Sequence, residues 1–95
     1  MSEWFTVSSV QTDLFIQAVA AVPGLEASVL ADLSLAQVVL GWLCAEQVVF
    51  PLQLLMARDA LVRVRDVAQE VGCPEMAEVM HMGYEEICCA LASLA

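Results

Sequence analysis

The hydrophobic and polar positions of this chain are organised around one stretch, residues 34–50 (SLAQVVLGWLCAEQVVF). After Ser34, its few polar side chains, two glutamines and one glutamate, fall on different sides of a helical wheel. A helix that is apolar on all sides has to be buried. The pattern therefore predicts a central helix over 34–50, capped by Ser34, with Trp42 as its largest side chain. Pro51 is expected to end it, because proline disfavours helical geometry in the residue before it.

The next segment, residues 51–71, is predicted to be an amphipathic helix. Its apolar positions recur at helical spacing and form one face: Leu54, Ala57, Leu61, Val64, Ala68 and Val71. The opposite face is charged: Arg58, Asp59, Arg63, Arg65, Asp66 and Glu70. Asp59 and Arg63 stand four residues apart, an ion-pair spacing worth only a few tenths of a kcal/mol. Gly72 is expected to end this helix, since glycine readily adopts the left-handed conformation of a helix C-terminus.

The last predicted helix covers residues 74–93 and begins with Pro74, whose missing N–H is tolerated at a first helical position. One face is apolar: Cys73, Met76, Met80, Tyr84, Ile87, Leu91 and Leu94. The other face is acidic: Glu75, Glu78, Glu85 and Glu86. Met82 and Cys89 lie among these acids, where no core is available to them. We therefore expect an interaction surface made of Met82, Cys89, Glu78, Glu85 and Glu86.

Two shorter helices are predicted before residue 34, over residues 9–22 and 25–33, separated by a Pro23-Gly24 break. Residues 1–8 form an N-terminal arm whose aromatic side chains are expected to fold back on the first helix. The fold class is accordingly all-α: a compact bundle of about five helices in a single domain, residues 1–95. The predicted core includes Trp42, Leu43, Leu61, Met80, Tyr84, Ile87 and Leu91.

Composition adds two constraints to this picture. The chain is 61% hydrophobic with a mean hydropathy of +0.79, above the roughly 45–50% apolar content of ordinary soluble domains. A chain of 95 residues has more apolar side chains than its interior can hold, so we expect a homodimer or a protein partner to cover the surplus. The net charge of −9 repels phosphates and so argues against nucleic acid and anionic membranes.

The four cysteines do not form a secreted disulfide framework, because Cys88 and Cys89 are adjacent and Cys44 lies inside the apolar stretch. The N-terminus has no basic region followed by an apolar one, so we see no signal peptide and expect a cytoplasmic protein. Residues 38–57 are long enough to span a bilayer. Glu46 within that window would cost about 2.5–3.5 kcal/mol in a membrane, so the spanning interpretation is not favoured.

Three groups of residues could form chemical sites, and each also has a structural interpretation. Cys73, Met76 and Met80 share a helix face, with His81 beside it and Cys88 two turns on, and soft sulfur ligands would select Cu(I). Methionine and unpaired cysteine also fill cores at this spacing, so we expect no metal there. Cys88 and Cys89 point about 100° apart on a helix and are expected to be structural thiols. His81 is the only histidine, and no nucleophile is placed by sequence to use it.

Glu46 has two interpretations, because it is an acid within the apolar stretch. If it is buried it needs a partner, and Arg58 or Arg65 could supply the cation. Alternatively it lies at a helix rim and faces water.

These features predict a non-enzymatic, small, acidic helical module that binds itself or a partner protein through apolar helix faces, in the manner of an adaptor or chaperone. One alternative is an acidic immunity or decoy protein that docks on a basic target. A second is a Cu(I)-binding helical protein. Neither a cofactor nor a small-molecule substrate is expected.

Overall fold

The molecule is built from helices joined by short connections. The computed structural model describes residues 9–94, and within that range it contains four helices and no β-strand. They are α1 (Ser9–Ala20), α2 (Glu26–Cys44), α3 (Pro51–Glu70) and α4 (Pro74–Ala92). The all-α prediction is confirmed, and the expected five helices are four over these residues. The predicted arm, residues 1–8, lies outside the described part of the chain.

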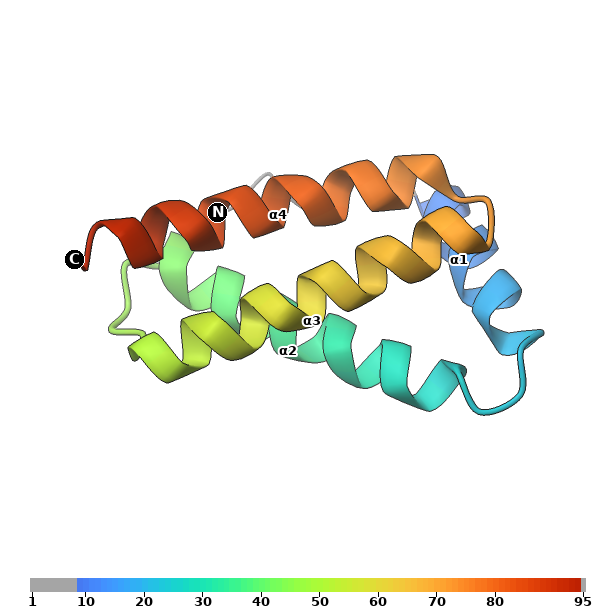
Figure 1. Ribbon diagram of the computed structural model, residues 1–95, viewed down its shortest axis with the longest axis horizontal. Coiled ribbons are helices and arrows are strands. Elements are labelled where there is room, and N and C mark those ends of the chain that lie inside the picture. The colour runs from blue at the N-terminus through green and yellow to red at the C-terminus, as the bar shows by residue number, and fades with distance from the viewer. Residues whose placement is uncertain (1–8, 95) are drawn as a thin grey trace.

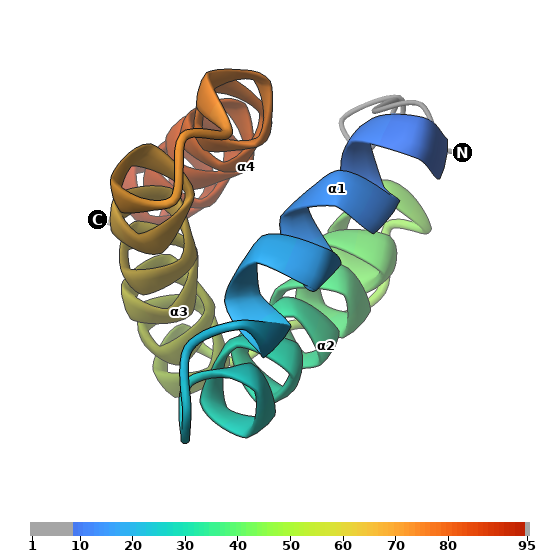
Figure 2. The ribbon, with the colours of Figure 1, turned by 90° about the vertical axis from the view of Figure 1, so that its right-hand side faces the viewer.

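Helix α3 occupies the middle of the arrangement, with α2 on one side of it and α4 on the other (Figure 1). Helices α3 and α4 run antiparallel and are joined by a tight turn at Gly72. Helix α1 lies at the end of the molecule where α4 begins, and it contacts both α2 and α4. Viewed along the long axis, α1 lies over α2 while α3 and α4 form a separate pair (Figure 2).

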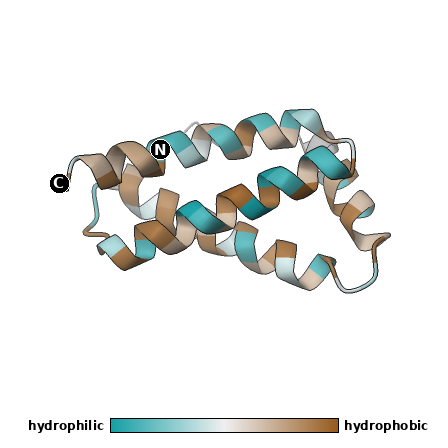
Figure 3. Cartoon of the chain, viewed as in Figure 1, coloured by the Kyte–Doolittle hydropathy of each residue, from teal (hydrophilic) through white to brown (hydrophobic). Residues whose placement is uncertain are grey.

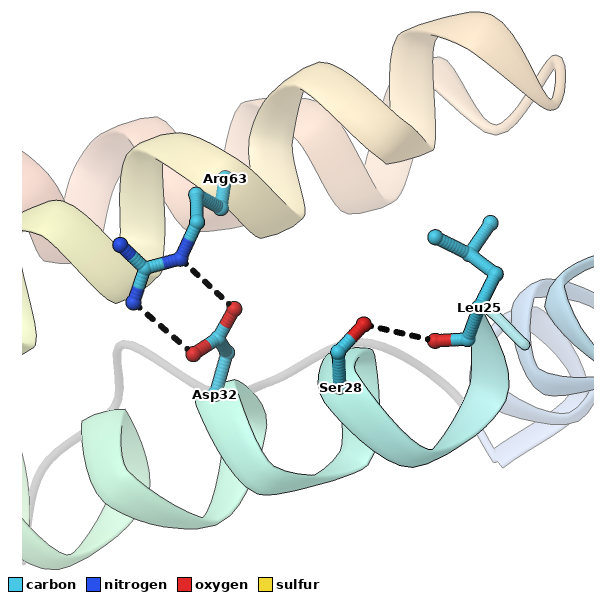
Figure 4. Close-up of polar contacts among 4 residues, drawn as sticks. All are labelled: Leu25, Ser28, Asp32 and Arg63. Atoms are coloured by element: carbon cyan, nitrogen blue, oxygen red, sulfur yellow. Dashed lines mark hydrogen bonds and ion pairs between the residues drawn. The ribbon is translucent and has the colours of Figure 1, made fainter.

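The prediction of two helices over 25–33 and 34–50 was wrong, because residues 26–44 form the single helix α2. Ser34 is an interior helical residue and not a cap. No glycine or proline interrupts the segment before Gly41, and a serine inside a helix is tolerated. Ser28, in the first turn of α2, donates a hydrogen bond from its hydroxyl to the carbonyl oxygen of Leu25 at 3.0 Å (Figure 4). Ser34, the capping residue expected from the sequence, thus does not mark a helix start.

Helix α2 also ends six residues before the predicted position. Glu46 adopts a left-handed conformation with φ of 56°. The Gln47 N–H donates to the Trp42 carbonyl at 2.9 Å, and the Glu46 N–H donates to that of Leu43 at 3.1 Å. These two bonds form the Schellman arrangement that closes many helices. Helix α3 ends in the same way, with Gly72 at φ of 79° in the left-handed position.

Helix α3 begins at Pro51, as predicted. Proline fits the first helical position because its missing N–H would have no partner there. The Gln53 side chain reaches back and accepts a hydrogen bond from the Phe50 N–H at 2.9 Å. The predicted helices over 9–22, 51–71 and 74–93 agree with α1, α3 and α4 to within two residues at each end.

The hydrophobic core takes residues from all four helices. Its larger buried members are Phe15, Val19, Val29, Leu33, Val39, Leu40, Leu54, Leu61, Val64, Met76, Met80 and Ile87. Of the residues predicted to lie in the core, Leu61, Met80 and Ile87 are fully buried. Leu43, Tyr84 and Leu91 are partly buried and pack against the cluster. Trp42 is 37% exposed, so its prediction as the largest core side chain was wrong.

The error about Trp42 follows from the error about which helix is central. Buried and exposed residues occupy opposite sides of α2, although both sides are apolar. The exposed side, called the α2 outer face below, consists of Ala27, Leu30, Ala31, Ser34, Gln37, Val38, Gly41, Trp42 and Ala45. Helix α3 has the better-covered position, because it packs against a neighbouring helix on each side.

Helices α2 and α3 are also tied by an ion pair. Arg63 donates from Nε and Nη2 to the two carboxylate oxygens of Asp32, each at 3.0 Å (Figure 4). This hydrogen-bonded pair raises the pKa of Arg63 above its usual value. The expected partner, Asp59, contacts Arg58 instead at 3.4 Å. Arg63 therefore links two helices and does not form the predicted pair along α3.

Candidate interaction groove

A groove lies between the C-terminal end of α2 and the second half of α4. Both helices pack on α3, and α1 lies across the opposite end of the molecule (Figure 1). At 1.5 Å per residue α1 is about 18 Å long, whereas α2 and α4 are each about 28 Å long. Helix α1 is therefore too short to cover the full length of α2 and α4. The uncovered part is a depression of about 530 Å³.

The lining of this groove is mostly apolar. Helix α2 contributes Leu43 and Cys44, and α4 contributes Met82, Glu85, Glu86, Cys89 and Ala90. Leu43, Cys44 and Ala90 are half-buried, whereas Met82 is 53% exposed. Four of the five residues predicted from sequence as an interaction surface thus line one groove: Met82, Glu85, Glu86 and Cys89.

The fifth predicted residue, Glu78, lies apart from this groove. It lines a second depression between α3 and α4, with Arg65, Gln69, Pro74, Ala77 and His81. Its position one turn before Met82 placed it on the acidic side of the helical wheel but not beside Leu43 and Cys44 of α2. A helical wheel gives the angular position of a residue around α4. It does not show which part of α4 lies beside the C-terminal end of α2, and that determines which residues line the groove.

One carboxylate at the rim of the groove is held by a chain of polar contacts. Arg65 Nη1 lies 3.2 Å from His81 Nδ1. Because a guanidinium can only donate, Nδ1 accepts and the imidazole proton is on Nε2, from where it reaches Glu85 Oε1 at 2.9 Å. Arg65 also lies over the ring of Tyr84, 5.7 Å from its centroid. These contacts orient Glu85 at the edge of the groove.

Tyr84 lies beside this polar chain and stacks on His81, with ring centroids 5.8 Å apart. A hydrogen bond with Cys88 raises the pKa of Tyr84 above its usual value of 10.0, and the negative charge of an ionised Cys88 adds to the effect. Arg58 and Arg65 act in the opposite direction. The face of α4 next to the groove is thus coupled to α3 through aromatic and cationic contacts.

The remaining sequence hypotheses concern Glu46 and the sulfur-containing residues. Glu46 is exposed in the turn after α2, while Arg58 contacts Asp59, and Arg65 contacts Asp66. The buried ion pair considered for Glu46 is therefore absent from the described residues. Met76 and Met80, two members of the proposed copper cluster, are 1% and 0% exposed, so their thioethers belong to the core packing. All four cysteines are free.

Helix α2 is the feature that sequence reasoning placed least well. By length and composition it is the one helix in residues 9–94 that could cross a membrane. This is weak evidence, because the core helix of a folded protein passes the same test, and α2 contributes five residues to the core. The window considered from sequence, residues 38–57, is not one helix, since it includes the end of α2, a turn and the start of α3.

Comparison with known proteins gives no relative from which a role could be transferred: no family model, no curated protein and no solved structure matches this chain. The functional argument therefore depends on the groove and on the exposed surfaces of this molecule.

Proposed function

We propose that this chain is a non-enzymatic protein-interaction module that binds a helix of a partner protein in the groove between α2 and α4. The observation that carries the proposal is the mostly apolar lining of that groove, which α2 and α4 form where α1 does not reach. An amphipathic helix laid into an apolar groove is a common mode of peptide recognition. The apolar face of such a helix would cover Leu43, Met82 and Ala90.

The charges around the groove indicate the chemistry of the partner. Glu85 and Glu86 line the groove beside the apolar residues, and the chain as a whole carries a net charge of −9. Complementary charge steers association and sets register more than it sets affinity. The partner helix is therefore proposed to be basic on its polar face and apolar on the other.

This proposal extends the sequence-based expectation of an adaptor or chaperone. In it, the four helices act as a small bundle that serves as a scaffold for the groove. We place the protein in the cytoplasm, a proposal supported by its four free thiols, because thiols are kept reduced in that compartment. The acidic immunity or decoy hypothesis stays as the second candidate, supported by the exposed carboxylates Glu75, Glu78, Glu85 and Glu86 along α4.

The two candidates differ in how much binding depends on apolar contact. The probe is a synthetic amphipathic helix of leucine and lysine, titrated by calorimetry into the full chain. A peptide with glutamate in place of each lysine is the control ligand. We expect the lysine peptide to bind, and Met82→Lys to weaken it at least about tenfold, because the change removes apolar contact and adds a like charge. The double variant Glu85→Gln, Glu86→Gln should weaken it less and reduce its dependence on salt.

Glu78→Gln is the control outside the groove, and it removes one carboxylate from α4 where the double variant removes two. We expect it to change the dissociation constant of the lysine peptide by less than about twofold, apart from the effect of the lower net negative charge. If Glu78→Gln weakened binding as much as the Glu85 and Glu86 changes, and Met82→Lys had no further effect, general acidic docking would replace the groove. Equal binding of the glutamate peptide would contradict both candidates.

A further inference from the structure

The α2 outer face is an exposed apolar surface that the proposed function does not use. Its exposed large side chains are Leu30, Val38 and Trp42, at 39%, 47% and 37% exposure. Serine and glutamine are its only polar members, and it contains no charged residue. From residue 33 to residue 45 α2 and its C-cap carry no charge at all. Few teal segments interrupt α2, whereas teal and brown alternate along α3 (Figure 3).

Charge decides what kind of surface can cover this face. Each chain carries a net charge of −9, and α1, α3 and α4 all present exposed acids, among them Asp13, Asp59 and Glu75. Two copies therefore repel each other through most orientations. Only between Glu26 and Glu46, which are exposed near the two ends of α2, does the α2 outer face let two such chains approach without placing carboxylates opposite each other.

Gly41 gives a second, independent indication. A glycine inside a helix destabilises it by roughly 0.5–1 kcal/mol relative to alanine. A Cβ placed on Gly41 would meet no atom from elsewhere in the described part of the chain within 4 Å, and the residue is in a regular helix with no positive φ. Nothing among residues 9–94 explains the absence of a side chain at this position. Close approach of another helix would explain it, because the distance between packed helices is set by the side chains at the contact.

The arrangement of Gly41 and Trp42 fits a second copy in particular. A two-fold interface uses the same patch on both molecules, so each residue that protrudes must meet a recess on the same patch. Trp42 is 37% exposed on this patch, and Gly41 beside it has no side chain and open space around it. When two α2 helices cross near these positions, the indole of each copy can cover the glycine of the other.

We propose that a second copy of this chain covers the α2 outer face, through a two-fold pairing of α2 with α2 that crosses near Gly41. One helix face offers less area than the roughly 800 Å² per partner of a standard stable interface. The dimer is accordingly a reversible one, and it leaves the groove between α2 and α4 free. This inference does not depend on the proposed function.

The main competitor for this face is a lipid surface. Insertion of α2 across a bilayer would withdraw Val29, Leu33, Ala36, Val39 and Leu40 from the core, so the fold would have to come apart. Shallow binding to a bilayer needs no such change, but the net charge of −9 disfavours anionic surfaces. Vesicles of neutral phosphatidylcholine are therefore the appropriate probe for lipid binding.

Sedimentation equilibrium of the full chain over a wide range of concentrations tests the proposal. We expect a monomer–dimer equilibrium in which Val38→Glu raises the dissociation constant at least about tenfold, since it places like charges opposite each other. Met82→Glu, which adds the same charge at a similarly exposed apolar residue in the groove, should leave the equilibrium unchanged. Circular dichroism on each variant confirms that it is folded.

Gly41→Ala should change the stability of the monomer and the affinity of the dimer in opposite directions. It should raise the urea midpoint of the dilute monomer, because alanine favours the helix, while weakening the dimer at least about fivefold, since each added methyl group keeps the helices apart. A surface helix without a partner would show the first effect alone, and that result would overturn the proposal.

Three further outcomes would contradict the inference. The first is a monomer at every concentration. The second is a dimer that Met82→Glu abolishes and Val38→Glu does not, which would assign self-association to the groove. The third is flotation of the wild-type chain with phosphatidylcholine vesicles that Val38→Glu prevents, which would assign the α2 outer face to lipid. None of these outcomes depends on whether the lysine peptide binds in the groove.

Discussion

Helices α2 and α3 have almost the same length, 19 and 20 residues. The more apolar of the two is not the one that is packed on both sides. Helix α2 carries two charged residues and α3 carries six. Nevertheless α3 is the helix with neighbours on both sides, while α2 leaves an apolar face exposed (Figure 1). The amphipathic helix is central, and the apolar helix is at the side.

The hydropathy of a helix therefore indicates how much of its surface has to be buried. It does not indicate which segment buries that surface. Leu61 of α3 is buried because α2 and α4 both pack on that helix. Trp42 of α2 is 37% exposed in the described part of the chain. The proposed dimer would cover this side of α2 with a second copy.

Truncation of one large side chain on each helix should give the largest difference between α2 and α3. Leu61 is 0% exposed and Trp42 is 37% exposed. Leu61→Ala should destabilise the fold by about 2–5 kcal/mol through loss of burial and creation of a cavity. Trp42→Ala should cost less than about 1.5 kcal/mol, measured by urea unfolding at a dilution where the dimer does not contribute. Equal shifts in the urea midpoint would mean that α2 is the central helix after all.

The ends of the two helices offer a second contrast. Both finish with a left-handed residue, Glu46 after α2 and Gly72 after α3. A residue with a Cβ pays about 1–2 kcal/mol in this conformation, which glycine avoids. Glu46→Gly should therefore stabilise the molecule by about 1 kcal/mol, and Gly72→Ala should destabilise it by a similar amount.

Thermal unfolding of these two variants checks that prediction. Gln47→Gly is a suitable control, since it introduces a glycine next to the left-handed position without relieving it. A destabilising Glu46→Gly would indicate that the glutamate has a role at this turn beyond its backbone conformation.

The ion pair between α2 and α3 should have a smaller effect. Asp32 and Arg63 make two hydrogen bonds, but the Arg63 side chain is 58% exposed. Pairs of this kind are worth about 0.2–1 kcal/mol. A double-mutant cycle with Asp32→Asn and Arg63→Gln should give a coupling energy in this range that falls as salt is added. A coupling near zero at low salt would show that the two helices are aligned by apolar packing alone.

The smallest expected effect concerns Tyr84 on α4. It is the single tyrosine of the chain, so its ionisation can be followed by absorbance without interference from another phenol. Its raised pKa means that the folded state holds the proton more tightly. Any stability it contributes is present below pH 10 and is lost as the pH rises through the higher folded pKa. Cys88→Ala should return the titration toward that of a free tyrosine, and an unchanged titration would exclude Cys88 as the cause.

Much of the fold followed from local patterns in the sequence. The bounds of α3 and α4 were predictable because proline, glycine and a two-sided helical pattern occur together at residues 51–72 and 74–92. Of the interaction residues, Met82 and Cys89 stood out because apolar side chains among acids have no core to enter. Both of them line the groove.

The remaining features depend on three-dimensional arrangement. The end of α2 was missed because Glu46, not glycine, occupies the left-handed position. The pairing of Arg63 with Asp32 joins residues 31 positions apart, so helical spacing could not indicate it. The α2 outer face was mistaken for core because an all-apolar pattern does not say which side is covered. Gly41 beside Trp42 was the sequence feature that could have indicated an exposed contact face, because a glycine inside a helix destabilises it unless another surface approaches closely there.

In a single copy of the chain, the outer face of α2 should be accessible to solvent. Acrylamide quenching of Trp42 fluorescence measures this accessibility, in a Trp4→Phe variant where Trp42 is the only indole. At high dilution the quencher should reach Trp42 readily, and protection should increase with protein concentration as second copies cover the face. Strong protection from acrylamide at the lowest concentration would contradict the account, because it would mean that Trp42 is buried within a single copy.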